Sequence, residues 1–216
     1  MTAMILAAGR GERLRPLTDT LPKALVEVRG AALIERHLEA LRSAGIGTVV
    51  INLGWLGEQI VDRIGSGARY GLNVVYSPEG DDVLETGGGI HRALPMLGHE
   101  PFLVINADIF TDMPLPRPDL SADDLGHLVL VPVPDHAAGG DFDLTGGRIR
   151  NGEPAAFTFS GVAVYRPELF ADCRPGRFPL APLLRAAADA DRLGGELYKG
   201  LWRDVGTPAR LSELNR

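Results

Sequence analysis

Short apolar runs that lack polar alternation recur through the first two-thirds of the chain. Each is rich in Val, Ile or Leu and too short for a core helix, so each predicts a strand buried on both faces, as in a parallel sheet. The four clearest runs are residues 4–8, 48–52, 102–106 and 127–133, and a weaker one, residues 73–77, follows a turn at Gly71.

Between these runs, apolar residues recur at the spacing of an α-helix. The predicted helices are residues 33–41, 56–64, 88–94 and 179–192. Gly45 supplies a C-terminal stop for the first helix, and Pro95 is expected to end the third. A further helix is expected to begin near Pro208.

The alternation of strands and helices predicts right-handed βαβ units. We therefore expect an α/β protein with a Rossmann-like three-layer fold and a mostly parallel central sheet. A glycine-rich segment, residues 139–154, predicts a hairpin around Gly146 and Gly147, and residues 158–165 return to a strand pattern. No linker or internal repeat is visible, so residues 1–216 are expected to form a single domain. Ligands of such a fold bind beyond the carboxyl ends of the strands.

Composition and charge narrow the class of protein. The net charge of the 216 residues is −6, which argues against nonspecific nucleic-acid binding because no basic patch dominates the chain. No apolar run approaches the roughly 18 residues that cross a bilayer, and the N-terminus lacks the features of a signal peptide. Cys173 is the one cysteine, so no intramolecular disulfide can form. We expect a cytoplasmic protein with neither a nucleic-acid nor a membrane partner.

The first apolar run leads into a glycine-rich turn that carries positive charge. Gly9 and Gly11 allow close backbone approach to a ligand, and Arg10, Arg13 and Lys23 lie in or after the turn. Spacing excludes a Walker A loop, and Leu14 stands where a dinucleotide-binding loop needs its third glycine. The short Gly-x-Gly string alone is equally consistent with an ordinary tight turn.

Two aspartates are candidates for a second part of the site. Asp108 follows the run at 102–106, where a carboxylate points into the ligand crevice, although Asp is also a common turn or helix cap. Asp204 lies near the C-terminus and has the same alternative role as a cap. The histidines show no paired zinc spacing, and no activated nucleophile is visible.

Two longer strings resemble the signature of the sugar-nucleotidyltransferases. The first, GxGxRLxPLTxxxPK, runs from Gly9 to Lys23, and the second, WxDVGTP, runs from Trp202 to Pro208. The resemblance implies the nucleotide-diphospho-sugar transferase type of fold, and a reaction in which a sugar 1-phosphate attacks the α-phosphorus of a nucleoside triphosphate. The attacking phosphate is mostly a dianion at neutral pH and needs no general base. Mg²⁺ would be held by Asp108 and Asp204.

The resemblance also assigns binding roles. Arg13 and Lys23 would hold the triphosphate, with Lys23 in a solvated loop. The other residues expected to bind the nucleotide are Gly9, Gly11, Glu12, Ser77, Thr86 and Gly87, and Glu79 is a further candidate. Those expected on the sugar-phosphate side are Asn106, Gly140, Glu153, Gly161 and Lys199. Many relatives carry Glu-Lys-Pro where this chain has Gly152-Glu153-Pro154, and Lys199 is the expected substitute for the missing lysine.

Shorter strings indicate the substrate pair. INLGWLGEQI, YSPEG and LETGGGI resemble the branch of the family that transfers a uridylyl group from UTP to N-acetylmuramate 1-phosphate in peptidoglycan recycling. Guanylyl transfer to mannose 1-phosphate is the alternative. A non-catalytic nucleotide-binding subunit is a third, but such a protein would be expected to lose a phosphate or metal residue, and Arg13, Lys23, Asp108 and Asp204 are all present.

Overall fold

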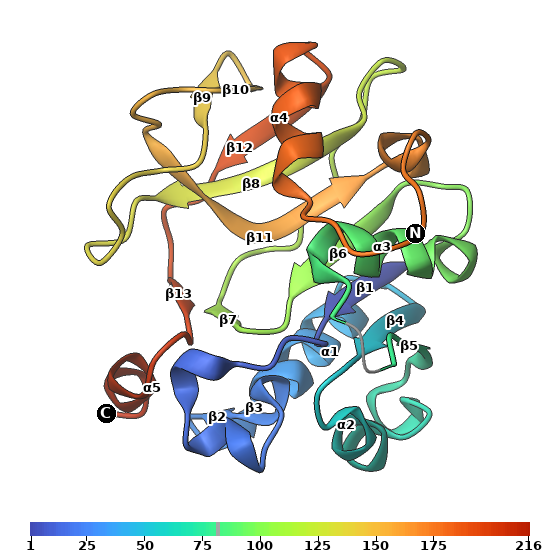
Figure 1. The fold of residues 1–216 in the computed structure, drawn as a ribbon, viewed down its shortest axis with the longest axis vertical. Helices are drawn as coiled ribbons and strands as arrows, with labels where there is room; N and C mark the ends of the chain where they lie inside the picture. The colour runs from blue at the N-terminus through green and yellow to red at the C-terminus, as the bar shows by residue number, and fades with distance from the viewer. Residues whose placement is uncertain (81–82) are drawn as a thin grey trace.

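A nine-stranded sheet forms the centre of the computed structural model, which describes residues 1–80 and 83–216 (Figure 1). In spatial order its strands are β5 (Asn73–Pro78), β4 (Thr48–Leu53), β1 (Ala3–Leu6), β6 (Phe102–Asn106), β11 (Phe157–Tyr165), β8 (Gly126–Pro132), β12 (Leu193–Leu197), β10 (Arg148–Arg150) and β9 (Asp143–Thr145). Neighbours from β5 to β6 are parallel, and the rest are antiparallel except for the parallel pair β8 and β12. The predicted α/β fold is confirmed, and its sheet is mixed, with the parallel pairings mainly in the N-terminal half.

Helices cover both faces of this sheet and give the predicted three layers. One face packs against α1 (Leu33–Ser43) and α2 (Gly57–Ile64), and the other against α3 (Glu85–Leu97) and α4 (Ala181–Asp189). Side chains alternate between the layers, since Ile5 belongs to the core of the first face and Met4 to that of the second. Because one sheet runs through the described residues, we propose that they form a single domain.

Two short ribbons lie outside the main sheet. β7 (Ile109–Thr111) pairs with β13 (Trp202–Asp204), and β2 (Glu27–Val28) pairs with β3 (Ala31–Ala32). A small separate core joins Val28 of the second ribbon to α5 (Pro208–Leu214) and to Leu14 of the 3₁₀ turn Glu12–Leu14. The segment that follows β1 and the C-terminal helix α5 therefore pack together on one side of the molecule (Figure 1).

Some predicted boundaries were wrong. Pro95 does not end α3, because a proline in the last turn removes only one hydrogen bond and its position is exposed to water. α4 is shorter than predicted, and β7, β12 and β13 were not predicted. The hairpin around Gly146 and Gly147 is confirmed, and both glycines have the positive φ that such a turn needs. Among the described residues, no helix has both the length and the apolar character needed to span a membrane.

Candidate active site

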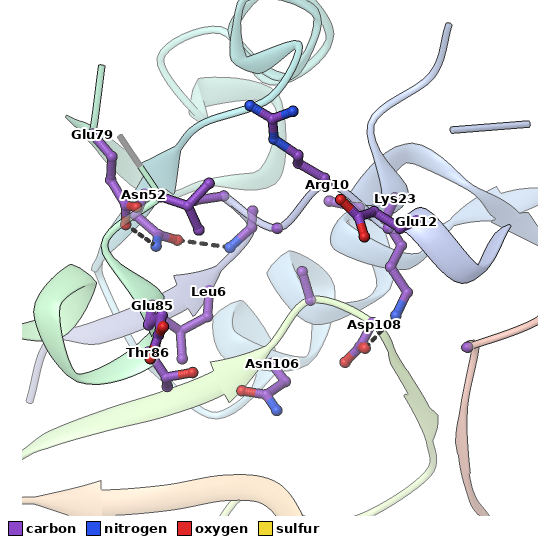
Figure 2. A pocket seen from close by; sticks show the side chains of 18 of the residues that line it. Leu6, Arg10, Glu12, Lys23, Asn52, Glu79, Glu85, Thr86, Asn106 and Asp108 are labelled. Carbon is purple, nitrogen blue, oxygen red and sulfur yellow. Dashed lines mark hydrogen bonds and ion pairs between the residues drawn. The ribbon is translucent and has the colours of Figure 1, made fainter. Parts of the chain in front are cut away.

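A cleft of about 970 Å³ opens at the carboxyl ends of β1, β4 and β6 (Figure 2). Its walls come from the glycine-rich turn after β1, the first turn of α3 and the segment after β6. Nine of the predicted site residues line it: Gly9, Gly11, Glu12, Arg13, Lys23, Glu79, Thr86, Asn106 and Asp108. The position relative to the strands agrees with the expectation for an open α/β sheet.

The turn after β1 is held in a fixed shape. Gly11 has a φ of +64°, and a Cβ there would lie 2.9 Å from Thr18 Cγ2 and 3.1 Å from Lys23 Cβ, so only glycine fits. The Thr18 hydroxyl donates to the Gly11 carbonyl at 2.8 Å. Trp55 Nε1 donates to the Thr18 carbonyl at 2.9 Å, and its ring lies 5.5 Å from the Arg10 guanidinium. The loop is therefore shaped before a ligand binds.

Lys23 and Asp108 form an ion pair across the cleft, with 2.5 Å between Nζ and Oδ2 (Figure 2). Only 15% of the Lys23 side chain is exposed. The prediction that Lys23 lies in a solvated loop was therefore wrong, because its ammonium group folds back onto a carboxylate from a distant strand end.

The second aspartate is brought beside the first by the β7–β13 ribbon. Asp204 stands opposite Ile109 in the register, and the Val205 N–H donates to the Asp108 carbonyl at 2.8 Å. The Asp204 carboxylate is bound by Arg210 Nη1, and His136 Nε2 lies 3.4 Å from its Oδ1. Asp204 is not part of the cleft lining.

Gly206 lines the cleft and lies next to the Asp204 carboxylate. A Cβ on Gly206 would lie 2.7 Å from Asp204 Oδ2, 2.9 Å from Arg210 Nη1 and 3.4 Å from Arg13 Nη2. Arg13, Asp204 and Arg210 therefore crowd around one glycine at the edge of the cleft.

The two aspartates suit a hard cation. Mg²⁺ prefers oxygen ligands and commonly takes only one or two carboxylates, completing its shell with waters and substrate phosphates. Among residues 1–80 and 83–216, no cluster of three or more His, Cys, Asp or Glu side chains is placed to hold a metal. His37, beneath Asp108, adds no competing charge, because burial lowers its pKa to about 4 although the charge of Asp108 opposes the shift.

A buried polar network lies at the other end of the cleft, and of its two side chains sequence reasoning named Glu79 but missed Asn52. Asn52 Oδ1 accepts from the Ala7 N–H, and Asn52 Nδ2 donates to Glu79 Oε1, both at 2.7 Å (Figure 2). Glu79 Oε2 accepts from the Leu84 N–H at 3.1 Å. The network ties β1, β4 and β5 to the start of α3. The sequence did contain a signal for Asn52, because it is the last residue of the apolar run 48–52, much as Asp108 closely follows the run 102–106.

The remaining predicted residues lie outside the cleft lining. Ser77 is fully buried in β5, and Gly87 packs against the Phe178 ring. Gly161, with a φ of +81°, allows close approach of Asn106, whose Nδ2 would lie 2.6 Å from a Cβ there. Gly140 packs against the backbone of residues 155–157, and Glu153 and Lys199 are exposed. Of the predicted sugar-side residues, only Asn106 lines the cleft, and sugar binding by the others stays a prediction.

Comparisons with known proteins agree with this geometry. The family model described as nucleotidyl transferase matches residues 2–138. The N-acetylmuramate α-1-phosphate uridylyltransferase of Neisseria meningitidis serogroup B is 49% identical, over 99% of this chain and 96% of the relative. The enzyme of the same name from Caulobacter vibrioides is 37% identical, over 98% and 97%. A UDP-glucose pyrophosphorylase solved with UDP-glucose has the same fold, with a TM-score of 0.78 at 20% identity over 99% of this chain and 96% of that one. The chain belongs to the nucleotidyl transferase family.

Proposed function

We propose that this protein transfers a uridylyl group from UTP to N-acetylmuramate α-1-phosphate, which yields UDP-N-acetylmuramate and pyrophosphate for peptidoglycan recycling. The observation that carries the proposal is the 49% identity to a uridylyltransferase of that specificity, which extends over nearly the whole of both chains. The reaction would take place in the cytoplasm, where nucleoside triphosphates are made.

The residues of the cleft suit an in-line displacement at phosphorus. Arg13 and Lys23 supply positive charge for the triphosphate, and the backbone N–H groups of Gly11 and Glu12 can bind its oxygens. The sugar phosphate is itself the nucleophile, so the protein has only to hold two anions in line and to stabilise the charge that develops. When the triphosphate binds, Lys23 exchanges its Asp108 partner for phosphate.

Members of the nucleotidyl transferase family generally use a divalent metal ion. We propose Mg²⁺, held by Asp108, which directly precedes β7, and by Asp204, which stands opposite Ile109 at the end of β13. A divalent ion held there would supply positive charge to stabilise the negative charge that develops on the reacting phosphates. Lys23 and Arg210, which now pair with the two carboxylates, would then be available to phosphate oxygens.

The other binding residues remain as proposed from the resemblance. Gly9, Ser77, Thr86 and Gly87 are assigned to the nucleotide, and Asn106, Gly140, Glu153, Gly161 and Lys199 to the sugar phosphate. Ser77 and Gly87 would act by shaping the wall, since neither lines the cleft. Lys199 would have to move inward to replace the lysine that many relatives carry where this chain has Glu153.

The deciding experiment is a matrix of nucleoside triphosphates against sugar 1-phosphates, scored by pyrophosphate release. UTP with N-acetylmuramate 1-phosphate should give the highest kcat/KM. Faster turnover of GTP with mannose 1-phosphate would replace this proposal by the guanylyltransferase alternative. Nucleotide binding without turnover of any pair would indicate a regulatory subunit.

A further inference from the structure

The glycines at the start of α3 make close contact with a loop from a distant part of the chain, residues 176–178. The Gly88 N–H donates to the Phe178 carbonyl at 3.1 Å, and the Phe178 N–H donates to the Leu84 carbonyl at 3.2 Å. A Cβ on Gly88 would lie 2.2 Å from the Gly176 carbonyl oxygen, and one on Gly87 would lie 2.5 Å from the Phe178 ring. The glycines of this motif therefore serve close backbone contact with this loop.

Docking of the loop puts Arg177 at the cleft. Arg177 lines the cleft and donates from Nε to Glu85 Oε1 at 2.7 Å. Glu85 itself has a φ of +60°, a conformation that non-glycine residues rarely adopt and that often marks functional sites. Among residues 1–80 and 83–216, Glu85 is the partner found for Arg177, and it engages Nε and leaves the two Nη groups at the end of the guanidinium without a partner from those residues.

Arg177 differs from the other cations of the cleft in its origin and place. Arg10, Arg13 and Lys23 all come from residues 9–23, where the phosphates are expected. In the view of Figure 2, Glu85 lies on the side of the cleft away from the Lys23–Asp108 pair, with Asn106 between them. A group bound by Arg177 therefore lies away from the phosphate-binding turn.

We infer that Arg177 determines sugar specificity by binding the carboxylate of the lactyl group of N-acetylmuramate. The inference rests on the proposed function. Apart from their phosphates, UTP and N-acetylmuramate 1-phosphate carry one anionic group, the lactyl carboxylate. A guanidinium whose Nε is already engaged can still bind a carboxylate through its two Nη groups, in a bidentate pair that is stronger than a neutral hydrogen bond. Glu85 is the positioning residue that fixes the guanidinium.

The test crosses two enzymes with two substrates. Wild type and Arg177→Gln are each assayed with UTP and either N-acetylmuramate 1-phosphate or its lactyl carboxamide, which keeps the size of the group and removes its charge. Wild type should prefer the carboxylate by about 10- to 100-fold in kcat/KM, the range expected for a charge-assisted contact. Arg177→Gln should lose that preference and use the carboxamide as well as wild type does. Arg174→Gln, on the same loop and absent from the cleft lining, is the matched control and should behave as wild type.

Each other outcome overturns the inference. If Arg177→Gln lowered kcat/KM equally for the carboxylate and the carboxamide, Arg177 would bind a part that the two substrates share or would support the fold. If Arg177→Gln kept the wild-type preference for the carboxylate, Arg177 would not bind the lactyl group. Arg177→Lys, which keeps one charge without the planar fork, should retain part of the preference. Wild type that turns over neither substrate with UTP would refute the proposed function itself and, with it, this inference. The wild-type assays alone show that failure, so the two are distinguishable.

Discussion

Replacing Asn52 by alanine should destabilise the fold by several kcal/mol. Its side chain joins the Ala7 N–H and the Glu79 carboxylate at 2.7 Å each, and both Asn52 and Glu79 are less than a tenth exposed. Truncation leaves a buried N–H unpaired and removes a donor from a buried carboxylate. Each buried group left unsatisfied costs about 1–3 kcal/mol, and more if it is charged, so the expected loss is about 3–5 kcal/mol. At roughly 2–4 °C per kcal/mol for a chain of this size, Tm should fall by about 10 °C.

The measurement is urea unfolding at pH 7, with the slopes compared to confirm that both variants unfold from equally compact states. Asn151→Ala is the matched control. Asn151 also donates two hydrogen bonds, to the Arg185 carbonyl at 3.0 Å and to Asp189 Oδ1 at 2.7 Å, but it is exposed and should cost only about 0.5 kcal/mol. If Asn52→Ala lost no more stability than Asn151→Ala, the reasoning about the buried network would be refuted.

Three further predictions concern other parts of the molecule. Asp108→Asn and Asp204→Asn should each lower kcat/KM on the order of 10³-fold. The double variant should lose little more than either single variant, because groups that hold one ion act as a unit. If the loss of the double variant equalled the product of the two single losses, the two aspartates would not share a metal ion. The hydrogen bond from Arg63 lowers the pKa of Glu35 from 4.5 to about 2. The contribution of the Glu35 carboxylate to the free energy of unfolding is therefore fully present above pH 4.5 and is lost as the pH falls through 2. Glu35→Gln should therefore lower the free energy of unfolding at pH 7 by about 1–2 kcal/mol, less than the pKa shift alone implies, because Arg63 is half exposed and solvent screens the pair. The urea midpoints of the variant and of wild type should converge as the pH falls from 4.5 to 2. Gly88→Ala should cost about 1–3 kcal/mol, since a backbone oxygen blocks the new methyl group, whereas Gly47→Ala, which has open space, should leave Tm nearly unchanged.

The strands of the N-terminal half could be predicted because their own residues determine them. β1, β4 and β6 come from short apolar runs, and their length and their content of Val and Ile favour a strand buried on both faces over a helix. β12 could not be found this way, since its sequence, LGGEL, contains two glycines that weaken a strand. The structure explains Gly195, because a Cβ there would lie 2.3 Å from Ile149 Cδ1 of the neighbouring strand. That contact depends on a pairing that no local pattern reveals.

The same division holds in the candidate site. Asp108 was predicted because the end of a buried strand faces the ligand crevice, and the rule would have found Asn52 had it been applied to every such run. Lys199 was chosen for its nearness in sequence to Asp204, yet it lies on an exposed turn outside the cleft lining. Arg177 had no signal at all, since its position depends on docking against glycines about ninety residues earlier in the chain.

The β7–β13 ribbon separates the two proposed metal-binding aspartates from the segment of the chain that is assigned to the sugar. Asp108 and Asp204 are nearly a hundred positions apart, but their spacing is set by a three-residue register and one backbone hydrogen bond from Val205. The intervening chain, including the segments assigned to the sugar, leaves the ribbon and returns to it. Insertions, deletions or grafted loops between residues 112 and 201 can therefore change what the pocket accepts while the two carboxylates keep their distance. For protein engineering, this makes the surface loops of that segment the parts to vary, whereas the ribbon and strands β8 to β12, which belong to the central sheet, are the parts to leave untouched.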